Sequence, residues 1–220
     1  MKFELIEVSG LKGSLLGLRL PMCKDLEEAS TKNDSYNNSN GILKGKFIVS
    51  ESDKKLCQKL INADSGEKAS GHGQPNSKFL RMIHAQICIT APLYFFKELD
   101  TYKVGTTSNS TSTMHRLANY PITMDCFEMD DYCGFFEIQW KNLIALLEQC
   151  RKEYNETKDK RYWKELIRLL PESWLQTRML DVDYQTLRNI YFWRKNHKLT
   201  EWYGFCEFIE TLPESWLITE

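Results

Sequence analysis

The sequence predicts an α+β fold, in a single domain that spans residues 1–220. Two patterns support this prediction. Strand-like alternation and short apolar runs concentrate in the first half, whereas apolar residues at helical spacing fill the second half. The composition agrees, because 42% of the residues are hydrophobic and 27% are charged, which is enough for a buried core under a solvated surface.

The first elements are a strand and two helices. Residues 2–8 alternate between polar and apolar, with acids inside the pattern, which indicates a strand rather than a signal peptide. A turn region of small residues follows, and then a short acidic helix over 24–29. A serine, Ser50 or Ser52, caps a longer helix that ends near Ala63.

Two polar segments surround that longer helix. Ser30–Gly41 has few apolar residues, which predicts a mobile surface loop, and a short strand is expected over 45–49. Residues 64–74 form a glycine-rich loop that holds His72. The flanking glycines would let His72 approach a ligand closely, although a histidine in such a loop is more often structural than a ligand.

The middle of the chain alternates between regular and polar segments. Phe79–Thr90 is expected to form a strand, after which Pro92 opens a helix that ends near Tyr102. Residues 104–112 are rich in hydroxyl groups. The acidic segment 121–134 is either a cation site or, more simply, a solvated loop.

The second half is expected to be helical. A stripe from Phe136 to Cys150 predicts a long helix that continues into residues 151–160, and two more helices fill the last third. Asp183 caps the first of these two, which ends near Lys198, and Thr200 begins the second. The hexapeptide Leu-Pro-Glu-Ser-Trp-Leu occurs twice, each time after a helical stretch, which predicts a shared helix-ending role.

Charge and cysteine usage exclude several classes of protein. The chain has 29 basic and 30 acidic residues, so it is neither a polybasic nucleic-acid binder nor a polyacidic protein. No apolar run reaches the ~18 residues of a membrane span. The seven scattered cysteines predict free thiols in a reducing cytoplasm, and the spacing of Cys126 and Cys133 does not favour zinc, so no metal site is expected.

The helix after Asp183 contains the most informative side chains. Leu187, Ile190, Arg194 and His197 share one stripe, which therefore passes from apolar residues to a guanidinium and an imidazole. A planar guanidinium suits a phosphate or the edge of a pyrimidine. The alternative is that these cations only complement the negative end of the helix dipole.

The order of these pieces resembles the flavin-dependent thymidylate synthases. That family carries the signature Arg-His-Arg, seven residues, Ser, one residue, Arg. Placing its serine on Ser112 puts the triplet on Tyr102-Lys103-Val104, where Lys103 is the only cation, and Asn109 also fits. Further matches are His72 after a glycine, Arg168 before a Leu-Leu-Pro segment, and Asn189 five residues ahead of Arg194, with His197 and Glu201 following.

The resemblance implies one α+β domain with a mixed or antiparallel sheet and a helical C-terminal half. It implies methylation of deoxyuridine monophosphate in dTMP biosynthesis, with FAD, a reduced nicotinamide nucleotide and methylenetetrahydrofolate. The protein would be a cytoplasmic homotetramer with its active sites between subunits. It assigns the catalytic role to Arg194, substrate contacts to Ser112, Arg168 and Arg194, and cofactor contacts to His72, Lys103, Asn109, Asn189 and His197.

The altered triplet leaves catalysis open. Two permanent charges of the family signature are absent from Tyr102 and Val104, and each lost charge-assisted hydrogen bond costs on the order of 1.5–3 kcal/mol. One reading is an FAD-dependent methyltransferase related to thymidylate synthase. The other is a catalytically inactive nucleotide-binding or interaction protein on the same fold.

Overall fold

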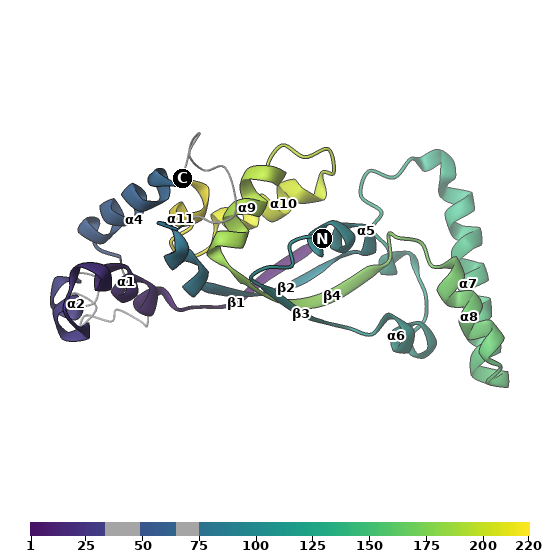
Figure 1. Ribbon diagram of the computed structural model, residues 1–220. Helices are drawn as coiled ribbons and strands as arrows, with labels where there is room; N and C mark the ends of the chain where they lie inside the picture. The colour runs from purple at the N-terminus through teal and green to yellow at the C-terminus, as the bar shows by residue number, and fades with distance from the viewer. Residues whose placement is uncertain (34–48, 65–74) are drawn as a thin grey trace. The chain divides into compact units, whose positions relative to one another are not determined.

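The computed structural model describes residues 1–33, 49–64 and 75–220 (Figure 1). Most of the expected strand over 45–49, and His72, lie outside these residues. The chain forms two compact units. The first unit comprises Met1–Phe3, Cys88–Thr101 and Ser108–Met179, and the second comprises Glu4–Ile87, Tyr102–Thr107 and Leu180–Glu220. That the whole chain acts as one domain stays a prediction.

Four strands form one sheet in the order β1-β2-β4-β3, which confirms the α+β class. The strands are β1 (Lys2–Ser9), β2 (His84–Pro92), β3 (Thr106–Ser110) and β4 (Leu175–Asp183). Strand β4 runs antiparallel to both of its neighbours. Beside β3, Thr111 pairs with Thr177 and Gly105 with Asp183, and beside β2, Leu93 pairs with Trp174 and Ile83 with Tyr184.

Strand β4 contradicts the expectation of an all-helical last third. Its sequence, LQTRMLDVD, mixes charged and amide side chains into the strand, so it lacks the simple alternation of a half-buried strand. Tertiary contacts satisfy those polar groups. The buried Gln176 donates from Nε2 to the carbonyl oxygen of Thr111 at 3.1 Å, and Arg178 donates to Asp100 at 2.7 Å.

Strand β2 begins later than expected. Lys78–Met82 form the 3₁₀ helix η3, and the strand starts only at His84. The apolar residues Phe79, Met82 and Ile83 follow helical spacing rather than alternation, which explains the difference. Within β2, alternate residues are buried, as the period of two requires.

The N-terminal helices belong to the second unit. The expected turn of small residues after β1 is instead the helix α1 (Leu11–Arg19), whose glycines hide its helical preference. Ser14, buried in α1, donates to the carbonyl oxygen of Phe79 at 2.8 Å. The short helix η1 (Leu20–Met22) follows, and α2 (Leu26–Lys32) then takes the place of the predicted acidic helix, continuing for three residues into the segment expected to be a polar loop.

Helix α4 (Glu51–Ala63) forms where it was predicted, with Ser50 as its cap. Its Asp53 is fully buried and accepts from Arg19 Nη2 at 2.6 Å and Nε at 3.1 Å. At the other end, Asp64 accepts from Ser77 Oγ at 2.7 Å and from the Ser77 backbone N–H at 2.6 Å. These carboxylates fix both ends of α4 within the second unit.

Three helices complete the second unit: α9 (Tyr184–Arg194), α10 (Glu201–Glu210) and α11 (Trp216–Thr219). Both α10 and α11 pack against α9. The buried Tyr184 ties the chain end to α9, since its hydroxyl donates to the carbonyl oxygen of Pro213 at 2.6 Å. The predicted start of α9 and α10 is confirmed, but α9 ends at Arg194 rather than near Lys198.

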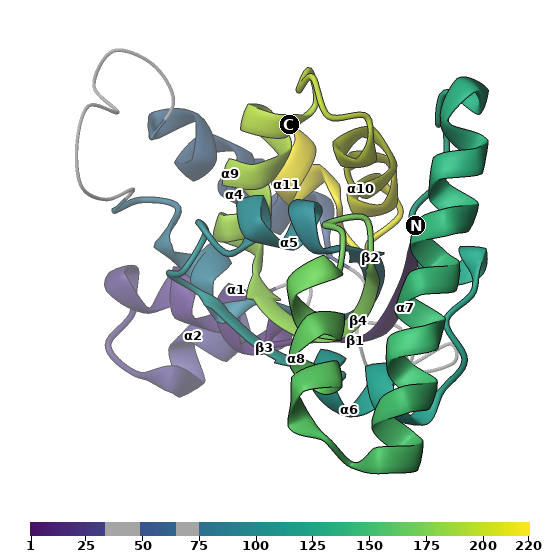
Figure 2. The same cartoon turned by 90° about the vertical axis from the view of Figure 1, so that its right-hand side faces the viewer.

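The first unit contains the helices α5 (Leu93–Leu99), α6 (Thr113–Asn119), α7 (Glu137–Thr157) and α8 (Lys160–Leu169), with the 3₁₀ turns η4 (Met124–Cys126) and η5 (Gly134–Phe136). Helices α7 and α8 lie side by side as a hairpin (Figure 2). The long helix was predicted, although it breaks at Lys158, which is in a left-handed conformation, and Phe136 at its start is exposed.

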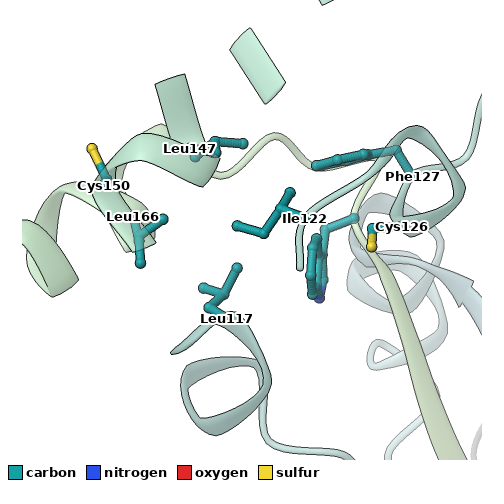
Figure 3. Packing of buried hydrophobic residues seen from close by; sticks show 8 residues of the cluster. Leu117, Ile122, Cys126, Phe127, Leu147, Cys150 and Leu166 are labelled. Carbon is teal, nitrogen blue, oxygen red and sulfur yellow. The ribbon is translucent and has the colours of Figure 1, made fainter. Parts of the chain in front are cut away.

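Side chains from α6, α7 and α8 form the apolar core of the first unit together with the segment 122–127 (Figure 3). Trp174 closes this cluster at 2% exposure, and its ring contacts Phe127 edge to face at 5.5 Å. The cluster contains Leu117, Ile122, Cys126, Phe127, Leu147, Cys150, Leu166 and Trp174.

The repeated hexapeptide has two structures. Both copies follow a helix, as predicted, because one comes after α8 and the other after α10. In the first copy Trp174 is buried and the next residue, Leu175, opens β4. In the second copy Trp216 opens α11, is half-buried and lies under Lys54 Nζ, 5.1 Å from the ring centroid.

All seven cysteines are free thiols, as predicted. Burial raises the pKa of Cys57 to about 12 and that of Cys206 to about 11, whereas Cys133 is exposed. Over the described part of the chain, no helix is both long and apolar enough to cross a bilayer.

Candidate functional site

Helix α9 carries the site. Its first turn is held by three hydrogen bonds that involve Asp183 and Thr186, which we call the interlocked cap. Asp183 accepts from the Thr186 backbone N–H at 2.6 Å, and its own N–H donates to the carbonyl oxygen of Gly105 at 3.0 Å. Thr186 Oγ1 donates to the carbonyl oxygen of Val104 at 2.9 Å. The segment that contains Tyr102 is thereby bound to the first turn of α9.

Arg194 is the last residue of α9, and its guanidinium is held between aromatic rings. Its Nε donates to the Tyr102 hydroxyl oxygen at 3.0 Å. Its Cζ atom lies 4.7 Å from the ring centroid of Trp202 and 5.6 Å from that of Tyr102. Cation–π contact from two rings and a hydrogen bond orient the cation before any ligand arrives.

His197 adds the third contact to this guanidinium. Arg194 Nη1 lies 2.8 Å from His197 Nε2, and a guanidinium only donates, so Nε2 is the acceptor in this bond. The Leu199 backbone N–H faces the other ring nitrogen, Nδ1, at 3.2 Å. A neutral imidazole has one acceptor nitrogen, so the two bonds compete, and a change of tautomer would exchange one for the other.

Trp202 is the fully buried aromatic residue against which Arg194 packs. It is fully buried in the first turn of α10, and its ring contacts Tyr102 at 6.5 Å and His197 at 6.4 Å between centroids. Arg194 and His197 remain half-buried above it. We call the four residues Tyr102, Arg194, His197 and Trp202 the arginine cluster. It presents a fixed, permanently charged, planar donor, which suits an anion or a carbonyl-bearing ring.

Two other predicted residues of the second unit, Lys103 and Asn189, lie within five residues of a member of the arginine cluster in sequence. Lys103 is exposed and directly follows Tyr102. Asn189 is exposed on α9, and its Oδ1 accepts from Gln185 Nε2 at 3.4 Å. His72 lies outside the described residues.

The predicted residues of the first unit have other partners. Asn109 is exposed on β3. Ser112 caps α6, its Oγ accepting from the His115 N–H at 3.3 Å. Arg168 is exposed and forms an ion pair with Glu165, one turn earlier in α8. Of the predicted set, Arg194 and His197 are thus the two that the structure joins by a direct contact.

Sequence reasoning missed the aromatic half of the arginine cluster. The sequence singled out Tyr102 only as a departure from the family signature and assigned no binding role to Trp202. Their shared role is visible only after the chain folds, because 100 residues separate them. Arg178 was also missed: its guanidinium stacks 4.0 Å from the ring centroid of Phe96, in the first unit.

Two solved structures of the flavin-dependent thymidylate synthase ThyX from Helicobacter pylori, each in complex with FAD and dUMP, are similar to this chain over 99% of its length. One has a TM-score of 0.68 at 15% identity and is covered over 98% of its own chain. The other has a TM-score of 0.69 at 16% identity and is covered over 97%.

A third similar structure is the UMP/dUMP methylase PolB from Streptomyces cacaoi, bound with 5-Br dUMP. Its TM-score is 0.56 at 14% identity, over 96% of this chain and 88% of that one. No protein-family model and no curated protein sequence matches the chain. The likeness is therefore one of three-dimensional structure: the chain has the fold of the flavin-dependent thymidylate synthases.

Proposed function

We propose that this protein binds a deoxyuridylate-type nucleotide through Arg194 and transfers a one-carbon unit to the pyrimidine with the help of FAD. The observation that carries the proposal is the arginine cluster, in which a guanidinium is oriented by three side chains. The fold supports it, because solved structures of this fold are complexes with dUMP or 5-Br dUMP. The fold alone does not define an activity, so the cluster is the stronger support.

The chemistry proposed for Arg194 follows from its charge. A guanidinium beside a pyrimidine carbonyl donates a hydrogen bond and favours the ionised ring nitrogen N3, because negative charge on the ring meets a permanent cation. Nε is engaged by Tyr102 and Nη1 by His197, so a nucleotide would meet a guanidinium whose orientation is already fixed. Ser112 and Arg168 are proposed as further substrate contacts.

The residues present fit a flavin nucleotide in donor chemistry. Lys103 and Asn189 expose an ammonium and an amide, which suit phosphate and carbonyl oxygens, and His197 and Asn109 complete the proposed contacts along with His72. When bound, the flavin would supply the hydride, with a reduced nicotinamide nucleotide and methylenetetrahydrofolate as co-substrates. We further propose a homotetramer that acts in dTMP biosynthesis in the cytoplasm.

One observation favours a second function, a nucleotide-binding protein without catalysis. At the positions of two family arginines stand Tyr102, whose hydroxyl already accepts from Arg194, and Val104, which is 82% exposed. Lys103 alone would then provide the positive charge for the flavin phosphates. Such a protein would keep the pyrimidine contact and lose the flavin.

Visible absorbance of the purified protein separates the two functions. We expect flavin absorbance that survives dialysis after FAD is added. A spectrum without flavin absorbance at saturating FAD would exclude the flavoenzyme, and dUMP titration by calorimetry would then decide whether nucleotide binding remains.

A matched pair of variants tests the nucleotide contact. Arg194→Ala should weaken dUMP binding about 10- to 100-fold, the effect of losing one charge-assisted hydrogen bond. Lys198→Ala removes the same charge from an exposed site four residues away and should leave the affinity within a factor of about two, because solvent screens a distant charge. Equal affinities of Arg194→Ala and the parent protein would refute the role of Arg194.

A further inference from the structure

The second unit contains a cavity of about 740 Å³ that the proposed function does not use. It lies between the end of α1, the turn η1, helix α4 and the 3₁₀ helix η3. Its volume falls within the range of small-molecule sites, and such sites combine apolar walls with a few polar groups. The lining residues are Gly17, Leu18, Arg19, Pro21, Met22, Cys23, Lys32, Leu56, Leu60, Pro75, Asn76, Lys78, Phe79 and Met82.

Most of this wall is apolar and adaptable. Leu56 and Leu60 project one turn apart from α4, so they form a continuous apolar strip. Met22 and Met82 are largely exposed thioethers on the other walls, and unbranched methionine side chains adjust to ligands of varied shape. A long apolar body, rather than a polar heterocycle, fits such a lining.

All charged residues in the described part of the wall are basic. Of the three cations, Arg19 is neutralised by the buried Asp53, and Lys32 Nζ lies 2.6 Å from Glu28 Oε1. Lys78 is exposed, and no carboxylate within the described residues forms an ion pair with it. Among the residues that the structure describes, the cavity thus offers one uncompensated positive charge, that of Lys78.

We propose that this cavity binds a long-chain carboxylate, with its hydrocarbon chain along Leu56 and Leu60 and its carboxylate on Lys78. A single anionic head matches the single uncompensated charge. A nucleotide would bring two or more phosphate charges, which exceeds the one uncompensated cation among the described residues of the lining. The site is independent of the arginine cluster, because the two have no residue in common.

The test is a titration of the full chain with cis-parinaric acid, a fluorescent fatty acid, below its micelle concentration. Leu60→Trp fills the cavity, and Lys78→Glu reverses the charge at an exposed position where folding is not at risk. The control is Lys55→Glu, which makes the same charge change at an exposed site of α4 outside the lining. The methyl ester of the probe serves as the uncharged ligand.

We expect saturable binding at one site per chain. Leu60→Trp should lower the affinity for the probe about tenfold or more. Lys78→Glu should lower the affinity for the acid by a similar factor and leave the affinity for the methyl ester unchanged, because only the acid carries charge. Lys55→Glu should bind like the parent protein. Absence of saturable binding, indifference to Lys78→Glu, or displacement of the probe by FAD or dUMP would each overturn the proposal, the last by assigning the cavity to the nucleotide site.

Discussion

Replacing Gly105 by alanine should loosen the start of the helix that carries Arg194. Gly105 has φ +73°, where an L-residue is strained by about 1–2 kcal/mol. An added Cβ would lie 2.0 Å from Asp183 Oδ2 and 2.7 Å from Thr186 Oγ1, so the capping carboxylate has to move. Losing that cap costs about 0.5–2 kcal/mol more, for a total of about 2–4 kcal/mol.

The assay is thermal and urea unfolding of Gly105→Ala beside Gly13→Ala. A loss of 2–4 kcal/mol corresponds to a Tm lower by roughly 5–15 °C in a chain of this size. Gly13 lies within α1 with no atom within 4 Å of an added Cβ, so alanine there should be neutral or stabilise by up to about 1 kcal/mol. If Gly105→Ala melts with the parent protein, the interlocked cap has no role in holding α9.

Three further predictions concern stability and reactivity. Burial alone would raise the pKa of Asp64, but hydrogen bonds from the Ser77 side chain and backbone outweigh it and hold that pKa below its usual range. The carboxylate therefore stabilises the fold at neutral pH, and this contribution disappears as the pH falls below about 4. In Asp64→Asn, the free energy of unfolding in urea should depend less on pH across that window. Tyr184→Phe removes a 2.6 Å bond to a carbonyl oxygen near the chain end and should cost about 1–2 kcal/mol in denaturant unfolding, and an unchanged midpoint would contradict this. With iodoacetamide and peptide mapping, the exposed Cys133 should be modified within the folded protein, whereas Cys57, whose pKa burial raises to about 12, should be modified only after unfolding.

Local patterns were sufficient for most of the helices. Ser50 and Asp183 act as the caps that the sequence indicated, because capping depends on a side chain and the three residues after it. Strand β4 and helix α1 were not predictable in this way. Buried Gln176 is satisfied by the distant carbonyl of Thr111, and the glycine-rich α1 is held by the contact of Ser14 with Phe79. Both depend on partners about 65 residues away in sequence.

The candidate site was predictable in part, for the same reason. Arg194 and His197 are three residues apart, so the sequence predicted them on one face of a helix. In the structure the helix ends at Arg194, and His197 contacts the guanidinium at 2.8 Å from the segment that follows. Tyr102 reaches Arg194 across 92 positions, and no local pattern encodes that contact. The resemblance identified Tyr102 as a substitution in the family signature. It did not indicate that the Tyr102 hydroxyl accepts a hydrogen bond from Arg194, which only the fold shows.

The two copies of the hexapeptide give this protein a built-in pair of spectroscopic reporters. Trp174 and Trp216 follow the same four residues and precede the same leucine, so 5-fluorotryptophan at both positions should give nearly coincident ¹⁹F resonances in the unfolded chain. In the folded chain one indole packs against Phe127 in the first unit and the other lies under Lys54 in the second, which separates the two signals. Because local sequence effects cancel, each signal tracks the packing of its own unit. If both signals move to the unfolded position at the same denaturant concentration, the two units unfold together. If they move at different concentrations, the units unfold separately.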